Sequence, residues 1–101
     1  MKQSDVYVDL DSNVISLASL DAEERKLVVR LRRQARLNAD WDTFDNLCYK
    51  AVGDFYDSRG VSRAKSRHSV PFRIAQDLSG RLAAITMIKA AHKSHSPVYP
   101  R

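Results

Sequence analysis

The sequence predicts an all-α fold: a small three-helix domain, built from an antiparallel helix pair and a long third helix, with an extended N-terminal arm. Only three Gly and three Pro occur in 101 residues, so we expect long regular elements and few turns. Apolar residues recur at helical spacing in three segments. The 44% hydrophobic and 29% charged fractions are typical of a globular domain rather than of a disordered chain.

The chain divides into an arm at residues 1–19, a helical domain at 20–93 and a tail at 94–101. Within the arm, residues 6–11 alternate: Val6, Val8 and Leu10 point to one side, and Tyr7, Asp9 and Asp11 point to the other. This period of two residues is typical of a strand. Asp11-Ser12-Asn13 fits a turn, after which a second strand could return. A two-stranded ribbon is marginal on its own. The arm therefore either lies against the helices or pairs with a second copy of the chain.

The first helix is expected at residues 20–37. Asp21 is its N-cap and Glu24 stands three residues later, which forms a capping box. One stripe of the helix is apolar, and its opposite side is densely basic. That basic side carries Arg25, Lys26, Arg30, Arg32, Arg33 and Arg36.

A second helix follows at residues 41–58, with Asp40 as its N-cap and Gly60 at the C-cap position. The break at 38–40 is short, so the first two helices should be antiparallel neighbours. The predicted apolar face of the second helix contains Trp41, Phe44, Leu47, Cys48, Ala51, Val52 and Phe55.

A basic connection at residues 61–69 shows no apolar period and leads to the third helix. Together with the preceding Arg59, it carries Arg63, Lys65 and Arg67. The connection is long for a helical bundle. We therefore expect it to be either mobile or functional.

The third helix, at residues 70–93, has two apolar faces. Pro71 fits its first turn, and the main stripe contains Ile74, Leu78, Leu82 and Ile85. The second face is made largely of small residues: Gly80, Ala84, Met87, Ile88 and Ala91. Either the first two helices each cover one face, or the second face contacts another copy or a partner. Both arrangements would hide the same residues from water.

No residue pattern points to catalysis. Cys48 falls within an apolar face, where a thiol is inert, and no phosphate-binding loop or hydrolase motif is present. His92 and His95 are spaced as two zinc ligands would be, but no acidic residue follows Asp77 to complete a site. We expect no enzyme activity, no cofactor, no metal and no small-molecule substrate.

Composition also limits the location and the partners. With one cysteine and no apolar run long enough to span a bilayer, the chain is expected to be cytoplasmic and not membrane-bound. The net charge is +5, and Lys and Arg dominate the C-terminal half. A basic surface permits an anionic partner but does not require one.

Two functions remain open. The first is a non-enzymatic protein-interaction module, a homo-oligomer or the binder of a protein partner. It would associate through the second face of the third helix, with the arm as a further candidate contact. The second is nucleic-acid binding through the basic side of the first helix and the basic connection. Its candidate residues are Arg25, Arg32, Arg33, Arg36, Arg59, Arg63, Lys65 and Arg67.

Overall fold

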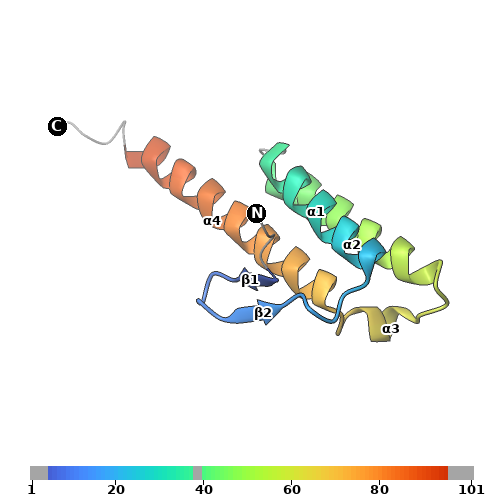
Figure 1. The fold of residues 1–101 in the computed structure, drawn as a ribbon. Helices are drawn as coiled ribbons and strands as arrows, with labels where there is room; N and C mark the ends of the chain where they lie inside the picture. The colour runs from blue at the N-terminus through green and yellow to red at the C-terminus, as the bar shows by residue number, and fades with distance from the viewer. Residues whose placement is uncertain (1–4, 38–39, 96–101) are drawn as a thin grey trace.

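Three helices pack together and carry a short hairpin, as the computed structural model of the chain shows for residues 5–37 and 40–95 (Figure 1). The helices α1 (Ala22–Leu37) and α2 (Trp41–Asp57) run antiparallel, and α4 (Val70–His95) packs against both. The predicted fold class is confirmed. Residues 1–4, 38–39 and 96–101 lie outside the described part of the chain, and with them most of the break at 38–40 and of the predicted tail.

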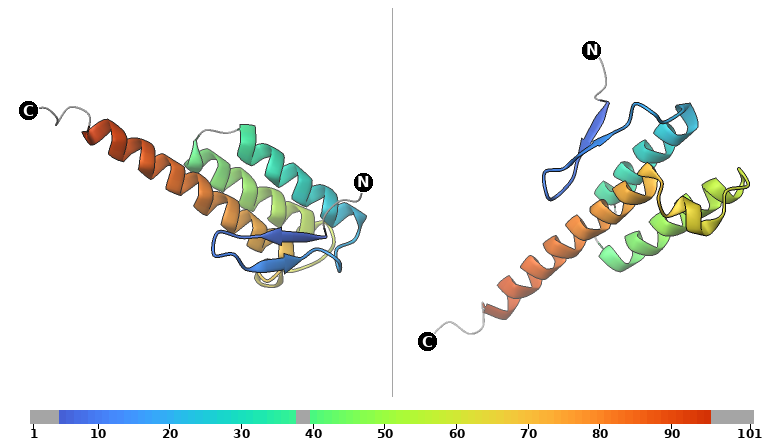
Figure 2. Two further views of the ribbon diagram at one scale, coloured as in Figure 1. Left: turned by 60° about the vertical axis from the view of Figure 1, so that its left-hand side comes forward. Right: turned by 90° about the horizontal axis from the view of Figure 1, so that it is seen from below.

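The arm forms a hairpin, one of the possibilities that the sequence left open for it. Strands β1 (Val6–Val8) and β2 (Val14–Ser16) pair antiparallel, with Tyr7 opposite Ile15. Asp9 holds the turn, because its carboxylate accepts hydrogen bonds from the backbone N–H groups of Asp11 and Asn13. The predicted alternation is present, and the side that faces the helices is the side of Tyr7 and Ile15, both buried. The hairpin lies against α4 of its own chain, which is the first of the two arrangements expected for the arm (Figure 2).

The helix ends follow the predicted signals. Asp21 and Glu24 form the capping box: the Glu24 N–H donates to Asp21 Oδ1 at 2.9 Å, and the Asp21 N–H donates to Glu24 Oε1 at 3.0 Å. Gly60 has φ of 73°, a left-handed conformation that glycine adopts without steric cost. The long third helix ends at His95, two residues past its expected end.

The predicted apolar face of α2 is correct at its centre and wrong at two positions, Leu47 and Trp41. Phe44, Cys48 and Val52 are buried, but Leu47 is 46% exposed. Trp41 is half-exposed at the edge of the bundle, where its indole N–H donates to the Ser79 hydroxyl at 2.9 Å. The elements that pack against α2 are α4, α3 and α1, and Leu47 lies outside the stripe that they cover, so it faces water.

The basic connection is more ordered than its sequence indicated. It contains a one-turn helix, α3 (Arg63–Ser66), which begins after Ser62. The Ser62 hydroxyl accepts a hydrogen bond from the Lys65 N–H at 3.2 Å, and the buried Ser66 donates to the Arg63 carbonyl. The sequence did not indicate α3, because the connection shows no apolar period.

The core spans all parts of the fold. Residues of the hairpin and of the segment after it join buried residues of the three long helices. The buried hydrophobic residues are Tyr7, Ile15, Leu17, Leu20, Leu27, Val28, Leu31, Phe44, Cys48, Val52, Tyr56, Ile74, Ala75 and Leu78. The buried part of α4 therefore ends near its middle, and Ile85, which the main stripe included, is 48% exposed.

Candidate protein interface

The second half of α4 extends past the other helices and is exposed (Figures 1 and 2). Every residue from Ala84 to Ala91 is exposed, and Met87 and Ile88 are 71% and 58% exposed. At about 100° per residue, five apolar residues of this segment fall on one arc of roughly 160°. We call them the α4 end face: Ala84, Ile85, Met87, Ile88 and Ala91.

The predicted small-residue face is divided between two environments. Gly80 lies beside the hairpin, since a Cβ placed there would be 3.7 Å from Leu10 Cδ1. Ala84, Met87, Ile88 and Ala91 are uncovered. Neither α1 nor α2 packs against the second face of α4. The hairpin covers the part of this face around Gly80, and no described residue covers the rest.

The α4 end face continues onto the hairpin. Leu10 beside Gly80 is 52% exposed, and Val8 is 50% exposed. Arg81 fixes this strand to α4, because its Nη2 donates to the Val8 carbonyl oxygen at 2.9 Å. Exposed apolar side chains of the hairpin and the helix thus lie on adjoining parts of one surface.

Asp77 on α4 is the main anchor of the hairpin. Its carboxylate accepts hydrogen bonds from the Tyr7 hydroxyl at 2.5 Å, from the Leu10 N–H at 2.8 Å and from Arg81 Nε at 2.8 Å. The Asp77 side chain is only 10% exposed. Burial acts to raise its pKa, but the hydrogen bonds from Tyr7 and Arg81 outweigh this and lower it.

This anchor predicts a loss of stability at alkaline pH. Burial, followed by the hydrogen bond to Asp77, raises the pKa of Tyr7 from 10.0 to about 12, despite the nearby Arg81. A raised folded-state pKa means that the stabilisation is complete below pH 10.0 and is lost as the pH rises toward about 12. Tyr56 contributes in the same direction, because burial and its bond to Glu24 also raise its pKa.

The measurement is the free energy of unfolding in urea as a function of pH, alongside the phenolate absorbance of the folded protein. Replacing Tyr7 with Phe should flatten the fall in stability above pH 10.0, because the group that titrates is gone. An equally steep fall in the Tyr7→Phe variant would contradict the assignment.

The candidate cations do not form one patch. Three of them are paired with carboxylates: Arg59 holds Asp21 through both terminal nitrogens, at 2.7 and 3.2 Å, Arg63 contacts Asp57 at 2.8 Å, and Arg25 contacts Asp5 at 3.2 Å. The Arg59 contact, with the Glu24 N–H next, lowers the pKa of Asp21 to about 2.

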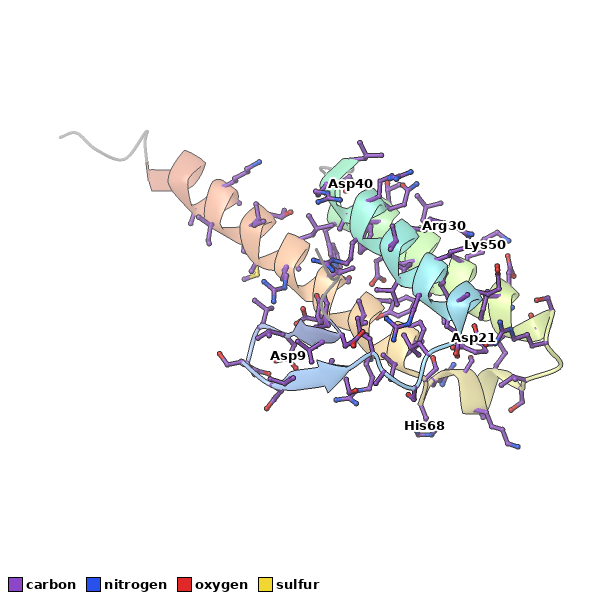
Figure 3. The ribbon with its side chains drawn as sticks, viewed as in Figure 1. Asp9, Asp21, Arg30, Asp40, Lys50 and His68 are labelled. Carbon is purple, nitrogen blue, oxygen red and sulfur yellow. The ribbon has the colours of Figure 1, made fainter. Side chains whose placement is uncertain are left out.

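The remaining candidates are exposed but scattered. Arg32 lies over the Tyr7 ring at 5.8 Å, which attaches α1 to the hairpin. Arg33, Arg36, Lys65 and Arg67 have no ion-pair partner among the described residues. Figure 3 shows Arg30 of α1 and His68, just after α3, on different sides of the molecule, so the two basic segments face apart.

No arrangement of the described residues resembles an active centre. Burial, with Asp45 next, raises the pKa of the Cys48 thiol to about 12, so this cysteine is an unreactive core residue as expected. Within residues 5–37 and 40–91, no three His, Cys, Asp or Glu side chains come together as metal ligands. Among the helices described, none is long and apolar enough to cross a bilayer. The side chains of His92 and His95 lie outside the described part.

Comparison with known proteins adds no relative. No family model matches the chain, and neither do curated proteins or solved structures. The class of protein that the fold defines is a mostly helical small domain with an N-terminal β-hairpin.

Sequence reasoning missed one feature, a cavity between α2, α3 and α4 lined in part by Tyr49, Gly53 and Phe72. Gly53 was its only signal, because a glycine in the middle of a helix costs about 1 kcal/mol relative to alanine and usually has a packing reason.

Proposed function

We propose that this chain is a non-enzymatic protein-interaction module, cytoplasmic as its single buried cysteine favours, that self-associates through the α4 end face. The observation that carries the proposal is the exposed apolar arc of α4 that continues onto Leu10 and Val8. Contiguous apolar surface of this kind typically marks an interaction site in a small domain.

A second copy suits this face because the face is self-complementary. Residues 82–91 contain one charged residue, Lys89, and it lies outside the end-face arc, about 40° past Ile85. If two copies of α4 cross antiparallel about a two-fold axis between Met87 and Ile88, Ala84 of one lies opposite Ala91 of the other. Met87 then lies opposite Ile88. Ala84 of one copy thus meets Ala91 of the other, and these small side chains permit the two helices to approach closely. The dipoles of the two helices point in opposite directions.

The size of the face indicates a dimer that depends on concentration. A stable interface buries about 800 Å² per partner, which is more than the roughly two helical turns from Ala84 to Ala91 provide alone. Leu10 and Val8 extend the contact because they adjoin the helix in each copy. We therefore expect a monomer–dimer equilibrium rather than an obligate dimer.

The test is light scattering after size exclusion over a dilution series, for the native chain and for Ile88→Asp. The native chain should move from monomer toward dimer mass as concentration rises. Ile88→Asp should weaken dimerisation at least tenfold, since it buries an unpaired carboxylate at the centre of the interface.

Ala90→Asp is the matched control, because it introduces the same side chain at an exposed position of α4 outside the end face. It should dimerise as the native chain does, and circular dichroism should show equal helix content in both variants. A native chain that stays monomeric at millimolar concentration would refute self-association. So would equal weakening by the two substitutions.

Nucleic-acid binding remains the alternative, with less support. Arg25, Arg59 and Arg63 are each paired with a carboxylate. Fewer cations are therefore left to bind phosphates and displace the counterions of a nucleic acid. What supports it is the exposed basic side of α1, where Arg33 and Arg36 have no ion-pair partner among the described residues.

A further inference from the structure

A cavity of about 560 Å³ lies where α3 packs beside α2 and the start of α4. Cavities that bind small molecules measure roughly 300–1,000 Å³. Its wall is formed by Tyr49 and Gly53 of α2, Arg63 and Arg67 in and after α3, and Phe72 of α4, with Ser66 and Gln76 between them. Three separate elements thus contribute to one concave site, remote from the α4 end face.

One wall of the cavity is aromatic. The rings of Tyr49 and Phe72 pack with their centroids 5.1 Å apart and their planes tilted by 35°. Both side chains are half-buried, so part of each remains accessible. A paired aromatic surface of this kind favours a planar ring that can stack or pack edge-on against it.

Gly53 makes room for a guanidinium group in the same cavity, one turn along α2 from Tyr49. A Cβ at this position would lie 2.4 Å from Arg63 Nη1 and 2.8 Å from its Cζ. The guanidinium therefore rests directly on the backbone of α2. Asp57 holds its Nη2 at 2.8 Å, with Asp54 at 3.7 Å. Asp57 thus orients the Arg63 side chain, which is 60% exposed, and the other nitrogens of Arg63 contact no carboxylate of the described chain.

Arg67 supplies a second cation that no carboxylate neutralises within the described residues. It follows α3 with a helical backbone, one turn after Arg63, so both side chains reach the same cavity. None of the described residues that line the cavity is acidic. The uncompensated positive charge of the site therefore comes from Arg67, because Arg63 is paired with Asp57 and lies near Asp54. The planar fork of arginine suits carboxylate and phosphate oxygens.

We propose that this cavity binds a small aromatic anion, a planar ring that carries a phosphate or carboxylate. The ring packs on Tyr49 and Phe72, and the anion is held by Arg67 and Arg63. Gln76 offers a further amide donor at the rim, where it is exposed. The site is independent of self-association, because no residue that lines it belongs to the α4 end face.

In the experiment, the full chain is titrated at low salt with phenyl phosphate, benzoate, inorganic phosphate and benzyl alcohol. Binding is measured from the amide chemical shifts in NMR spectra. Phenyl phosphate or benzoate should bind at least tenfold more tightly than either inorganic phosphate or benzyl alcohol. Only these two ligands carry both a ring for the aromatic side chains and an anionic group for the arginines. The largest shifts should lie at Gly53, Arg67 and Phe72. The aromatic anion that binds more tightly identifies the acid group.

Substitutions separate the two walls. Arg67→Gln should weaken phenyl phosphate about tenfold, as expected for loss of a charge-assisted hydrogen bond. Phe72→Leu should weaken phenyl phosphate but leave inorganic phosphate unchanged. Gly53→Ala favours the helix and displaces the Arg63 guanidinium, so it should weaken binding in a chain that still folds.

Arg73→Gln is the control, since Arg73 is an exposed cation of α4 that does not line this cavity. It should bind phenyl phosphate as the native chain does. Equal losses for Arg67→Gln and Arg73→Gln would reduce the effect to overall charge and overturn the proposal. So would inorganic phosphate that binds as tightly as phenyl phosphate, or shifts that map elsewhere on the molecule.

Discussion

Replacing Asp77 with Ala is expected to lower the free energy of unfolding by about 2–4 kcal/mol and to release the hairpin from α4. The carboxylate accepts three hydrogen bonds, from the Tyr7 hydroxyl, the Leu10 N–H and Arg81 Nε. Its side chain is 10% exposed, so its partners would lose a largely buried acceptor. The measurements are urea unfolding and hydrogen exchange of the hairpin amides.

Asp11→Ala is the matched control, because it removes an exposed carboxylate from the turn of the same hairpin. Its effect should stay within about 0.5 kcal/mol. If Asp77→Ala had no larger effect than Asp11→Ala, the hairpin would have to be held by its apolar contacts alone. Since Val8 and Leu10 belong to the proposed interface, a released hairpin should also weaken dimerisation.

Phe44→Ala is expected to cost about 3–5 kcal/mol of stability, the range for deleting a buried phenyl ring. Phe44 is 0% exposed at the centre of the core, and α1 and α4 both pack against its helix. The surrounding side chains can collapse only partly into the space that remains. Thermal and urea unfolding of the variant give the value.

Leu47→Ala on the same helix is the informative comparison. The sequence placed Leu47 on the same apolar face as Phe44, but the structure leaves it 46% exposed. Its loss should cost less than about 1 kcal/mol, because little apolar area returns to water. Similar costs for the two substitutions would mean that α2 is rotated relative to the orientation described.

Local signals predicted the helices well because each signal acts within one or two turns. The capping box of Asp21 and Glu24 and the left-handed Gly60 occur as expected, since they depend only on neighbouring backbone groups. The helical period likewise identified Cys48 as a core residue. The one-turn helix α3 was missed because it is too short to show a period.

Contacts between distant segments could not be read in this way. The sequence showed two apolar faces on the third helix but could not tell what covers the second one. The structure places the hairpin over Gly80 and leaves Met87 and Ile88 exposed. The pairing of Arg59 with Asp21 and the approach of Arg63 to Gly53 likewise join residues that no periodicity connects.

The sequence by itself determined the helical class and most helix ends and allowed a hairpin in the arm, because caps, turns and amphipathic periods are properties of short segments. Only the tertiary structure decided which charges are neutralised, which apolar residues stay in water and where a cavity forms. These depend on how whole elements pack. Asp77 contacts Tyr7 and Leu10, which lie 70 and 67 residues away in the sequence, and these contacts position the surface on which the proposed function depends.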